Sequence, residues 1–294
     1  MLPITEQENP NTATIDKAST IDAARLINNE DKLVTAAVEK VLPQVAEAID
    51  HIVERLEKGG RLFYIGTGTS GRLGVLDASE IPPTYGVSYD LVQGIIAGGY
   101  EALYKATEAS EDNREAAMAD LKARGLTRPD AVVGIAASGR TPYTIGAVEY
   151  ARSLGCYTAA IVCNPDSEIT KAVDVAIVPV VGPEAITGST RMKAGTAQKI
   201  VLNLFSTAVM IRLGRVYKGL MVDMVPTNAK LRKRAVKMVA DIAGVTFEEA
   251  EKALRIGGNI KTAVLVAAGL NLEEAKSRLA AAGGNLRIAL KSGR

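Results

Sequence analysis

The sequence predicts an α/β protein in which helices cover both faces of a mostly parallel sheet, with a small helical domain at the C-terminal end. Short apolar runs that end in Gly, Ser or Asn alternate with segments of helical length, which is the pattern of right-handed βαβ units. The 294 residues are 47% hydrophobic but only 4% aromatic, without Trp. The core is therefore expected to consist of Ala, Val, Ile and Leu, which suit buried parallel strands.

The first elements are helical and the next are strands. Residues 1–20 are polar and lack periodicity, whereas 20–58 are predicted to form helices, with Pro43 bending or beginning one of them. Five strands are expected within 61–66, 89–99, 131–138, 157–163 and 173–182. Ligands of such a sheet bind at the carboxyl ends of the strands.

The last third of the chain is predicted to be helical. Residues 189–213 begin with hydroxyl side chains suited to N-capping and continue as an apolar helix, which we expect inside the domain or at a subunit interface. The last fifty residues predict three or four short helices separated by glycines. We therefore divide the chain into an N-terminal helical segment packed on the sheet domain (1–58), the sheet domain itself (59–243) and a small helical domain (244–294).

Charge and cysteine content argue against several classes of function. The formal net charge is only +2, from 35 basic and 33 acidic residues, so nothing favours binding to nucleic acid or to an anionic membrane surface. Two cysteines are too few for a secreted disulfide framework, and neither a signal peptide nor a long apolar stretch is present. We expect a soluble cytoplasmic protein. Its single histidine, His51, also argues against a multi-histidine metal site.

Three segments have the same features: each is rich in small hydroxyl side chains, and each leads into a predicted helix. They are GTGTSGR (66–72), ASGRT (137–141) and TGSTRMK (187–193). The first is neither a P-loop nor a dinucleotide fingerprint. One such loop alone is typical of a helix cap, but three in one α/β chain favour a phosphate site. The candidate binding residues are Thr67, Thr69, Ser70, Ser138, Thr141, Ser189, Thr190 and Lys193.

Acid–base chemistry in this chain would have to depend on carboxylates, because a catalytic histidine or reactive cysteine motif is missing from the sequence. Glu80 follows the helix after the first segment, and Pro82 and Pro83 are expected to stop that helix. Glu111 lies before another predicted helix. Taken alone, both are typical of solvated surface carboxylates, as are Asp77, Glu108 and Asp112.

The three segments resemble the N-acetylmuramic acid 6-phosphate etherases. The resemblance is carried by GTGTSGRLGVLDASEIPPTYG (66–86), IAASGRTPYTIGA (135–147) and, above all, GPEAITGSTRMKAGTAQK (182–199). It extends from ITEQENPNT near residue 4 to the helical tail. The third segment has a related form in mammalian glucokinase regulatory proteins.

The resemblance implies a sugar isomerase (SIS) domain, a three-layer α/β/α fold with a five-stranded parallel sheet, followed by a small all-helical domain. It implies a cytoplasmic homodimer without metal or organic cofactor. The implied reaction splits the D-lactyl ether of N-acetylmuramic acid 6-phosphate with water, giving N-acetylglucosamine 6-phosphate and D-lactate, in the recycling of cell-wall sugars.

Carried over residue by residue, the catalytic glutamates of the family fall on Glu80 and Glu111. We assign the indispensable proton transfer to Glu80 and assistance, including activation of water, to Glu111. The phosphate loops fall on Thr69 and Ser70 and on Ser138 and Thr141. Ser189, Thr190 and Lys193 are expected to complete the pocket, within one subunit or across the dimer interface.

Two alternatives remain open at this stage. A phosphosugar isomerase would share the phosphate loops and a glutamate base, but would not need room for a lactyl carboxylate. A sugar-phosphate-sensing regulator would bind without turnover, although the regulators of this type contain two SIS units, whereas this chain has room for one.

Overall fold

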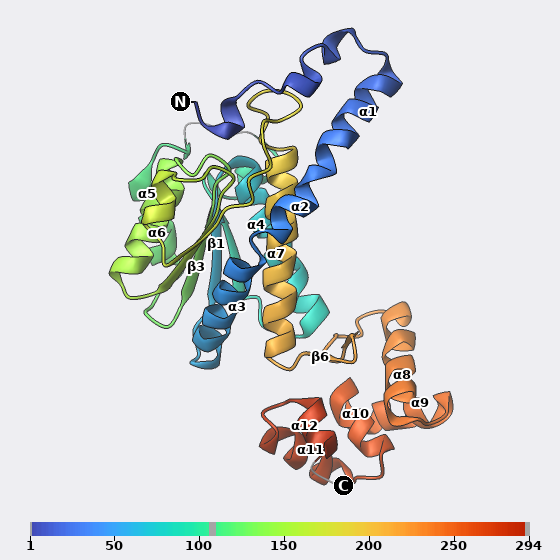
Figure 1. Cartoon of the computed structure of the whole chain (residues 1–294). Helices are drawn as coiled ribbons and strands as arrows, with labels where there is room; N and C mark the ends of the chain where they lie inside the picture. The colour runs from blue at the N-terminus through green and yellow to red at the C-terminus, as the bar shows by residue number, and fades with distance from the viewer. Residues whose placement is uncertain (1, 106–109, 292–294) are drawn as a thin grey trace. The chain divides into compact units, whose positions relative to one another are not determined.

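The structure is a computed structural model that describes residues 2–105 and 110–291 (Figure 1). All five predicted strands form, and they pair in parallel in the order β2-β1-β3-β4-β5. The strands are β1 (Leu62–Gly66), β2 (Val92–Ile96), β3 (Ala131–Ile135), β4 (Tyr157–Ile161) and β5 (Val175–Ile177). The predicted five-stranded parallel sheet is therefore confirmed.

Helices cover both faces of this sheet, which gives the predicted three layers (Figure 1). Helices α5 (Arg114–Ala123) and α6 (Pro142–Ser153) lie on one face, where Leu121 and Val148 share an apolar core with Phe63 of β1. The opposite face is covered by α3, α4 and α7. The bounds of these three helices are Leu42–Glu57, Gly68–Tyr85 and Lys193–Arg212. The strands are buried on both sides, as expected for apolar parallel strands.

The N-terminal segment reaches the sheet through three short 3-10 turns and two helices. These are η1 (Ile4–Glu6), η2 (Pro10–Thr12), η3 (Ile15–Lys17), α1 (Thr20–Asp31) and α2 (Leu33–Glu39). Pro43 lies in the first turn of α3, so it begins that helix. The segment packs on the sheet domain through buried polar contacts, which include a hydrogen bond of 2.8 Å from Thr12 Oγ1 to the carbonyl of Ala185.

Helix α7 is buried along much of its length. In the part of the chain that the structure describes, it is the one helix whose length and composition would allow it to cross a membrane. However, 56% of its most apolar stretch is buried inside the protein, as is usual for a core helix.

The chain divides into two compact units at a different place from the one predicted. The first unit contains Met1–Ser79 and Tyr89–Thr207, and the second contains Glu80–Ser88 and Ala208–Arg294. The described elements of the second unit are the hairpin β6 (Val216–Tyr217) and β7 (Leu220–Met221) and the helices α8 (Ala229–Ala243), α9 (Phe247–Gly257), α10 (Ile260–Ala267), α11 (Leu272–Ala281) and α12 (Leu286–Lys291).

The predicted boundary near Gly244 falls inside the core of this second unit. Val239 of α8, Ala253 of α9 and Val264 of α10 belong to one buried apolar cluster. Gly244 is the C-cap of α8, with a φ of 71°, a conformation that favours glycine. Gly244 therefore marks a turn between α8 and α9, which share a core. The second unit also contains the short β6–β7 hairpin, so it is not entirely helical.

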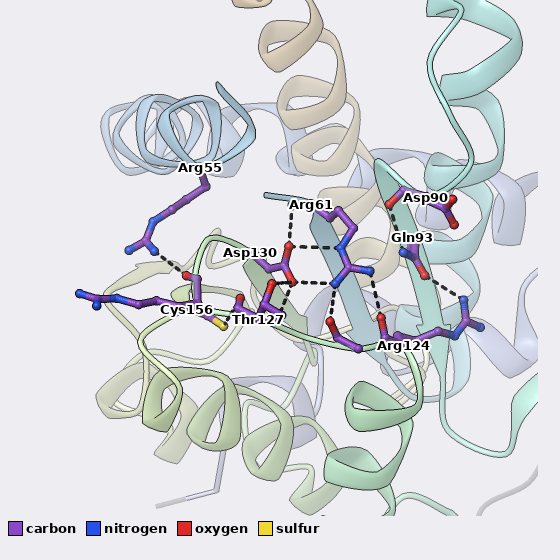
Figure 2. Close-up of polar contacts among 10 residues, drawn as sticks. Arg55, Arg61, Asp90, Gln93, Arg124, Thr127, Asp130 and Cys156 are labelled. Atoms are coloured by element: carbon purple, nitrogen blue, oxygen red, sulfur yellow. Dashed lines mark hydrogen bonds and ion pairs between the residues drawn. The ribbon is translucent and has the colours of Figure 1, made fainter. Parts of the chain in front are cut away.

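A buried polar network holds the amino ends of the two central strands (Figure 2). The carboxylate of Asp130, before β3, accepts hydrogen bonds from the backbone N–H of Arg61 at 2.7 Å, from its guanidinium at 2.9 Å and from Thr127 N at 2.8 Å. Burial alone would raise the pKa of Asp130, but the hydrogen bonds from Arg61 and Thr127 outweigh this effect and lower it. The network thus ties β1 to β3 at the end opposite their hydroxyl-rich loops.

Asp77 of α4 is buried, and its interpretation as a surface carboxylate was wrong. It is 7% exposed, and its Oδ1 accepts hydrogen bonds from Asn203 and Ser206 of α7 at 2.9 and 3.1 Å. The buried hydroxyl of Tyr64 interacts with the same carboxylate, and burial and then the neighbouring Asp77 raise the pKa of Tyr64 well above its usual value. Burial raises the pKa of Asp77 from 3.8 to about 6, although the hydrogen bonds from Asn203 and Ser206 oppose this change.

We predict that Asp77 makes the protein less stable as the pH rises from about 4 to about 6. In this interval the folded state holds a proton that the unfolded state has released, so the free energy of unfolding falls by about 2 kcal/mol, out of about 3 kcal/mol over the whole titration of Asp77. Asp77→Asn should remove this dependence and raise the free energy of unfolding at pH 7.5 by about 1–3 kcal/mol. Urea unfolding at pH 4.5 and 7.5 measures both effects, and an equal pH dependence in the two proteins would contradict the prediction.

Candidate functional site

A pocket of about 310 Å³ lies where the strand order reverses, between β1 and β3. At this position the loops after the two strands diverge to opposite sides of the sheet and leave a crevice, which is where open α/β sheets bind ligands. The residues that line it come from both loops, the turn before α7, the segment before α5 and the N-terminal segment. They are Glu6, Thr67, Gly68, Thr69, Ser70, Arg72, Ala102, Glu111, Ala136, Ala137, Ser138, Thr141 and Thr190.

The first loop forms as predicted, because its glycines let α4 start directly against the sheet. Gly68 has a φ of 48°, and a Cβ on Gly71 would lie 2.6 Å from the carbonyl oxygen of Gly66, closer than real Cβ atoms come. Thr69 and Ser70 therefore fall in the first turn of α4, whose backbone N–H groups have no intrahelical acceptor. This is the arrangement that binds anions at helix starts.

The second loop is shaped by Gly139 and closed by the start of α6. Gly139 has a φ of 67°, and a Cβ there would lie 2.0 Å from Ser167 Oγ, so only glycine fits. Ser138 Oγ accepts a hydrogen bond from the N–H of Arg140 at 3.2 Å, and Thr141 is the N-cap residue of α6. Both predicted side chains of this loop line the pocket.

The third segment contributes only Thr190 to the pocket, and the start of α7 is already occupied. The buried carboxylate of Glu184 accepts hydrogen bonds of 2.9 Å from the N–H groups of Lys193 and Ala194. Lys193 is 1% exposed, and its Nζ donates to Glu30 of α1 at 2.5 Å. Lys193 therefore anchors the N-terminal segment, and neither Lys193 nor Ser189 lines the pocket of its own chain.

The two predicted catalytic glutamates lie in different surroundings. Glu111 lines the pocket, with its Oε1 3.4 Å from the position of a Cβ on Gly68, and its carbonyl accepts a hydrogen bond from Tyr143 N at 3.0 Å. Glu80 is exposed and does not line the pocket of its own chain. The residue lies ten positions beyond Ser70 on the same helix, which corresponds to about 15 Å of helical rise.

The expectation that Pro82 and Pro83 stop α4 was wrong. Pro82 and Pro83 do not stop α4, which continues through both to Tyr85 and ends at Gly86 with a φ of 62°. Both prolines lie in the last turn of α4, which continues although neither has an N–H to donate to the preceding turn. Glu108 lies outside the described residues.

Sequence reasoning missed two charged residues that line the pocket, Glu6 and Arg72. Arg72 lies in the first loop segment, and its Nε donates a hydrogen bond of 3.0 Å to the carbonyl of Leu103, in the stretch that leads to Glu111. Glu6 belongs to the aperiodic N-terminal segment. The only signal for it was that the resemblance to the etherases begins at residue 4.

The described residues contain no cluster of three or more His, Cys, Asp and Glu side chains that could hold a metal ion.

Both cysteines are buried and free. Burial raises the pKa of Cys163 to about 12 and that of Cys156 to about 11, so neither supplies a thiolate at neutral pH.

Comparison with known sequences assigns the family. The chain matches the SIS domain over residues 111–208 and the N-terminal SIS domain of glucokinase regulatory protein over 44–152. It is 56% identical over 290 residues to the N-acetylmuramic acid 6-phosphate etherase of Cronobacter sakazakii, covering 98% of both chains. The chain belongs to the N-acetylmuramic acid 6-phosphate etherase family. The etherase of Symbiobacterium thermophilum is 60% identical over 264 residues, covering 89% of this chain and 87% of the relative.

Solved structures resemble this etherase-family chain in fold alone. A Bacteroides fragilis protein assigned as a phosphosugar isomerase involved in capsule formation matches 68% of this chain and 95% of its own, with a TM-score of 0.53 and 20% identity. A protein of Escherichia coli CFT073 matches 69% of this chain and 97% of its own, with a TM-score of 0.51 and 18% identity. These matches agree with the predicted SIS fold.

We predict that a buried hydrogen bond from Ser70 to α7 holds the first loop of this family member in place. Ser70 Oγ donates to Gln198 Oε1 at 2.9 Å, and both side chains are buried. Gln198→Leu should lower the free energy of unfolding by about 1 kcal/mol. It leaves a buried hydroxyl without its acceptor, but it also removes Gln198 Nε2, which is buried without a partner among the described residues.

Urea unfolding measures this loss, with Thr196→Ala as the control because Thr196 is exposed on the same helix. In a double-mutant cycle with Ser70→Ala the two losses should not add. Additive losses would show that the two side chains act independently.

Proposed function

We propose that this protein cleaves the D-lactyl ether of N-acetylmuramic acid 6-phosphate with water, giving N-acetylglucosamine 6-phosphate and D-lactate. One observation carries this proposal: a chain that is 56% identical to an etherase over nearly its whole length has a pocket in which phosphate-binding loops and Glu111 meet. The phosphate would anchor the substrate at a distance from the carbons that react, and its binding energy would serve to position them.

The phosphate is proposed to bind to the starts of α4 and α6 and to the hydroxyls around them. Thr69 and Ser70 lie in the first turn of α4, Thr141 caps α6, and Ser138 and Thr190 line the same pocket. Helix N-termini and hydroxyl donors stabilise a phosphate without a dedicated cation. Lys193 has no part in this proposal, since its ammonium group is paired with Glu30.

The proposed reaction is an elimination followed by addition of water. In the open-chain sugar the C2 hydrogen lies next to the aldehyde, so a carboxylate can remove it as a proton while the C3–O bond breaks and the lactate oxygen is protonated. Water then adds to C3 of the unsaturated aldehyde, and a proton returns to C2. Only protons and water are exchanged, so the reaction needs neither an oxidant nor a reductant.

Glu111 is proposed to transfer one of these protons, and Glu80 to do so in the site of a partner subunit. Glu80 is exposed on α4, and Leu76, one turn before it, is an exposed apolar residue with 52% of its surface accessible. A homodimer contact over this part of α4 would bury Leu76 and carry Glu80 to the pocket of the other copy. We further propose a cytoplasmic location and a role in the recycling of cell-wall sugars.

The test is the release of D-lactate, followed with a coupled D-lactate dehydrogenase. The substrate is N-acetylmuramic acid 6-phosphate, the control is the unphosphorylated sugar, and EDTA is present throughout. Release from the phosphorylated sugar alone supports both the etherase activity and the phosphate loops. Tight phosphosugar binding without release would instead favour the sensor, and interconversion of phosphosugars would favour the isomerase.

We predict that Glu111→Gln and Glu80→Gln each lower kcat by about 10² or more, the scale of a lost general acid or base, and leave phosphosugar binding largely intact. Equal amounts of the two inactive variants, unfolded and refolded together, should regain about a quarter of the activity, because random pairing restores one complete site in half of the dimers. A mixture that remains inactive would show that each subunit uses its own Glu80.

A further inference from the structure

Glu6 introduces a second carboxylate into the pocket. Of the described residues that line the pocket, Glu6 and Glu111 are the acidic ones and Arg72 is the basic one. A carboxylate beside a bound phosphate is electrostatically unfavourable. Glu6 is exposed, so water solvates its carboxylate, and a ligand that covers it would have to supply hydrogen-bond donors that a phosphate does not offer. The catalytic scheme above does not use this carboxylate.

The backbone beside Glu6 is fixed by a buried amide that also holds the second phosphate loop. Thr5 N donates to Asn164 Oδ1 at 3.2 Å, and Asn164 Nδ2 donates to Thr5 Oγ1 at 2.8 Å. Thr5 and Asn164 are 1% and 4% exposed. The same Nδ2 lies 3.2 Å from the carbonyl of Ala137 and 3.4 Å from that of Ser138. One side chain thus links the position of Glu6 to that of Ser138.

A second set of contacts holds Glu6 against the turn that carries Thr190. Asn9 Nδ2 donates to the carbonyl of Pro183 at 3.0 Å, which fixes the N-terminal segment along the stretch before this turn. The Oε2 atom of Glu6 lies 3.3 Å from the position of a Cβ on Gly188. Gly188 has a φ of 75°, which a residue with a side chain rarely adopts. The carboxylate is therefore seated on the rim of the pocket between two of its loops.

We propose that Glu6 is a sugar-binding residue whose carboxylate accepts hydrogen bonds from hydroxyl or amide N–H groups of the phosphosugar. An ionised carboxylate is an acceptor only, and a phosphate dianion offers it no donor. The hydroxyls and the acetamido N–H of an amino sugar do offer donors, and hydrogen bonds to a charged acceptor are about twice as strong as neutral ones. This inference rests on the proposed function for the class of ligand.

The experiment compares Glu6→Gln with Glu8→Gln, a matched control because Glu8 is exposed two residues further on and does not line the pocket. Steady-state kinetics on N-acetylmuramic acid 6-phosphate give KM and kcat. Inhibition constants are measured for two probes, N-acetylglucosamine 6-phosphate and inorganic phosphate. Glu6→Asp, which keeps the charge but shortens the side chain, is the second variant, and thermal unfolding checks that all variants are folded.

For Glu6→Gln we expect KM and the inhibition constant of the aminosugar phosphate to rise about tenfold, with kcat within about threefold of wild type. The inhibition constant of inorganic phosphate should be unchanged or lower, since a negative charge is removed. Glu8→Gln should match the wild type.

Three results would overturn the inference. Equal weakening of phosphate and phosphosugar would mean that Glu6 only shapes the loops. A fall in kcat of about 10² at constant KM would make it a proton-transfer group. Unchanged constants would mean that it does not contact the sugar. If the wild type binds the aminosugar phosphate but releases no D-lactate, the proposed function fails. Dissociation constants of the two probes, measured by isothermal titration calorimetry on the same variants, then still test Glu6.

Discussion

Parallel pairing of β1 with β3 is the constraint on which the candidate site depends. The register aligns Gly66 with Ile135, so the two hydroxyl-rich loops leave the sheet at the same level and on opposite sides of it. The buried contact of Arg61 with Asp130 fixes the opposite ends of the same two strands. A shift in the register between β1 and β3 would displace the loop after β3 along the strand direction relative to the loop after β1. The hydroxyl groups of the two loops would then no longer converge on one pocket.

Much of this arrangement could be predicted from the sequence, because local signals and the topology agree. Apolar runs that end in Gly, Ser or Asn predicted all five strands, and the rule that ligands bind at carboxyl ends placed Ser70 and Ser138 close together. Glu111 was placed at the same site only by the resemblance to the etherases. The glycines of both loops were a second signal, since their backbone conformations and close contacts exclude other residues. Each of these features depends on neighbours within a few positions, or on the order of strands.

The features that escaped prediction are those set by distant partners. A hydroxyl-rich helix start predicts an anion site, but the carboxylate of Glu184 already caps α7, and Lys193 is paired with a residue 163 positions away. Asp77 looks like any polar residue of a helix until α7 covers it. Glu6 lies in an aperiodic stretch, and only the folded chain brings it to the pocket. The exposed position of Glu80 outside its own pocket could not be predicted either, because local sequence does not tell which helix face remains uncovered.

The long-range contacts of the N-terminal segment also affect the order in which the chain folds during translation. Asn9 is hydrogen-bonded to a residue 174 positions later, and Thr5 to one 159 positions later. At about 5–20 residues per second, a ribosome needs about 10–35 s to supply these partners. Through that interval the first turns of the nascent polypeptide lack these long-range hydrogen bonds, although the strands can begin to assemble. The pocket is thus completed late, by the part of the chain that is translated first.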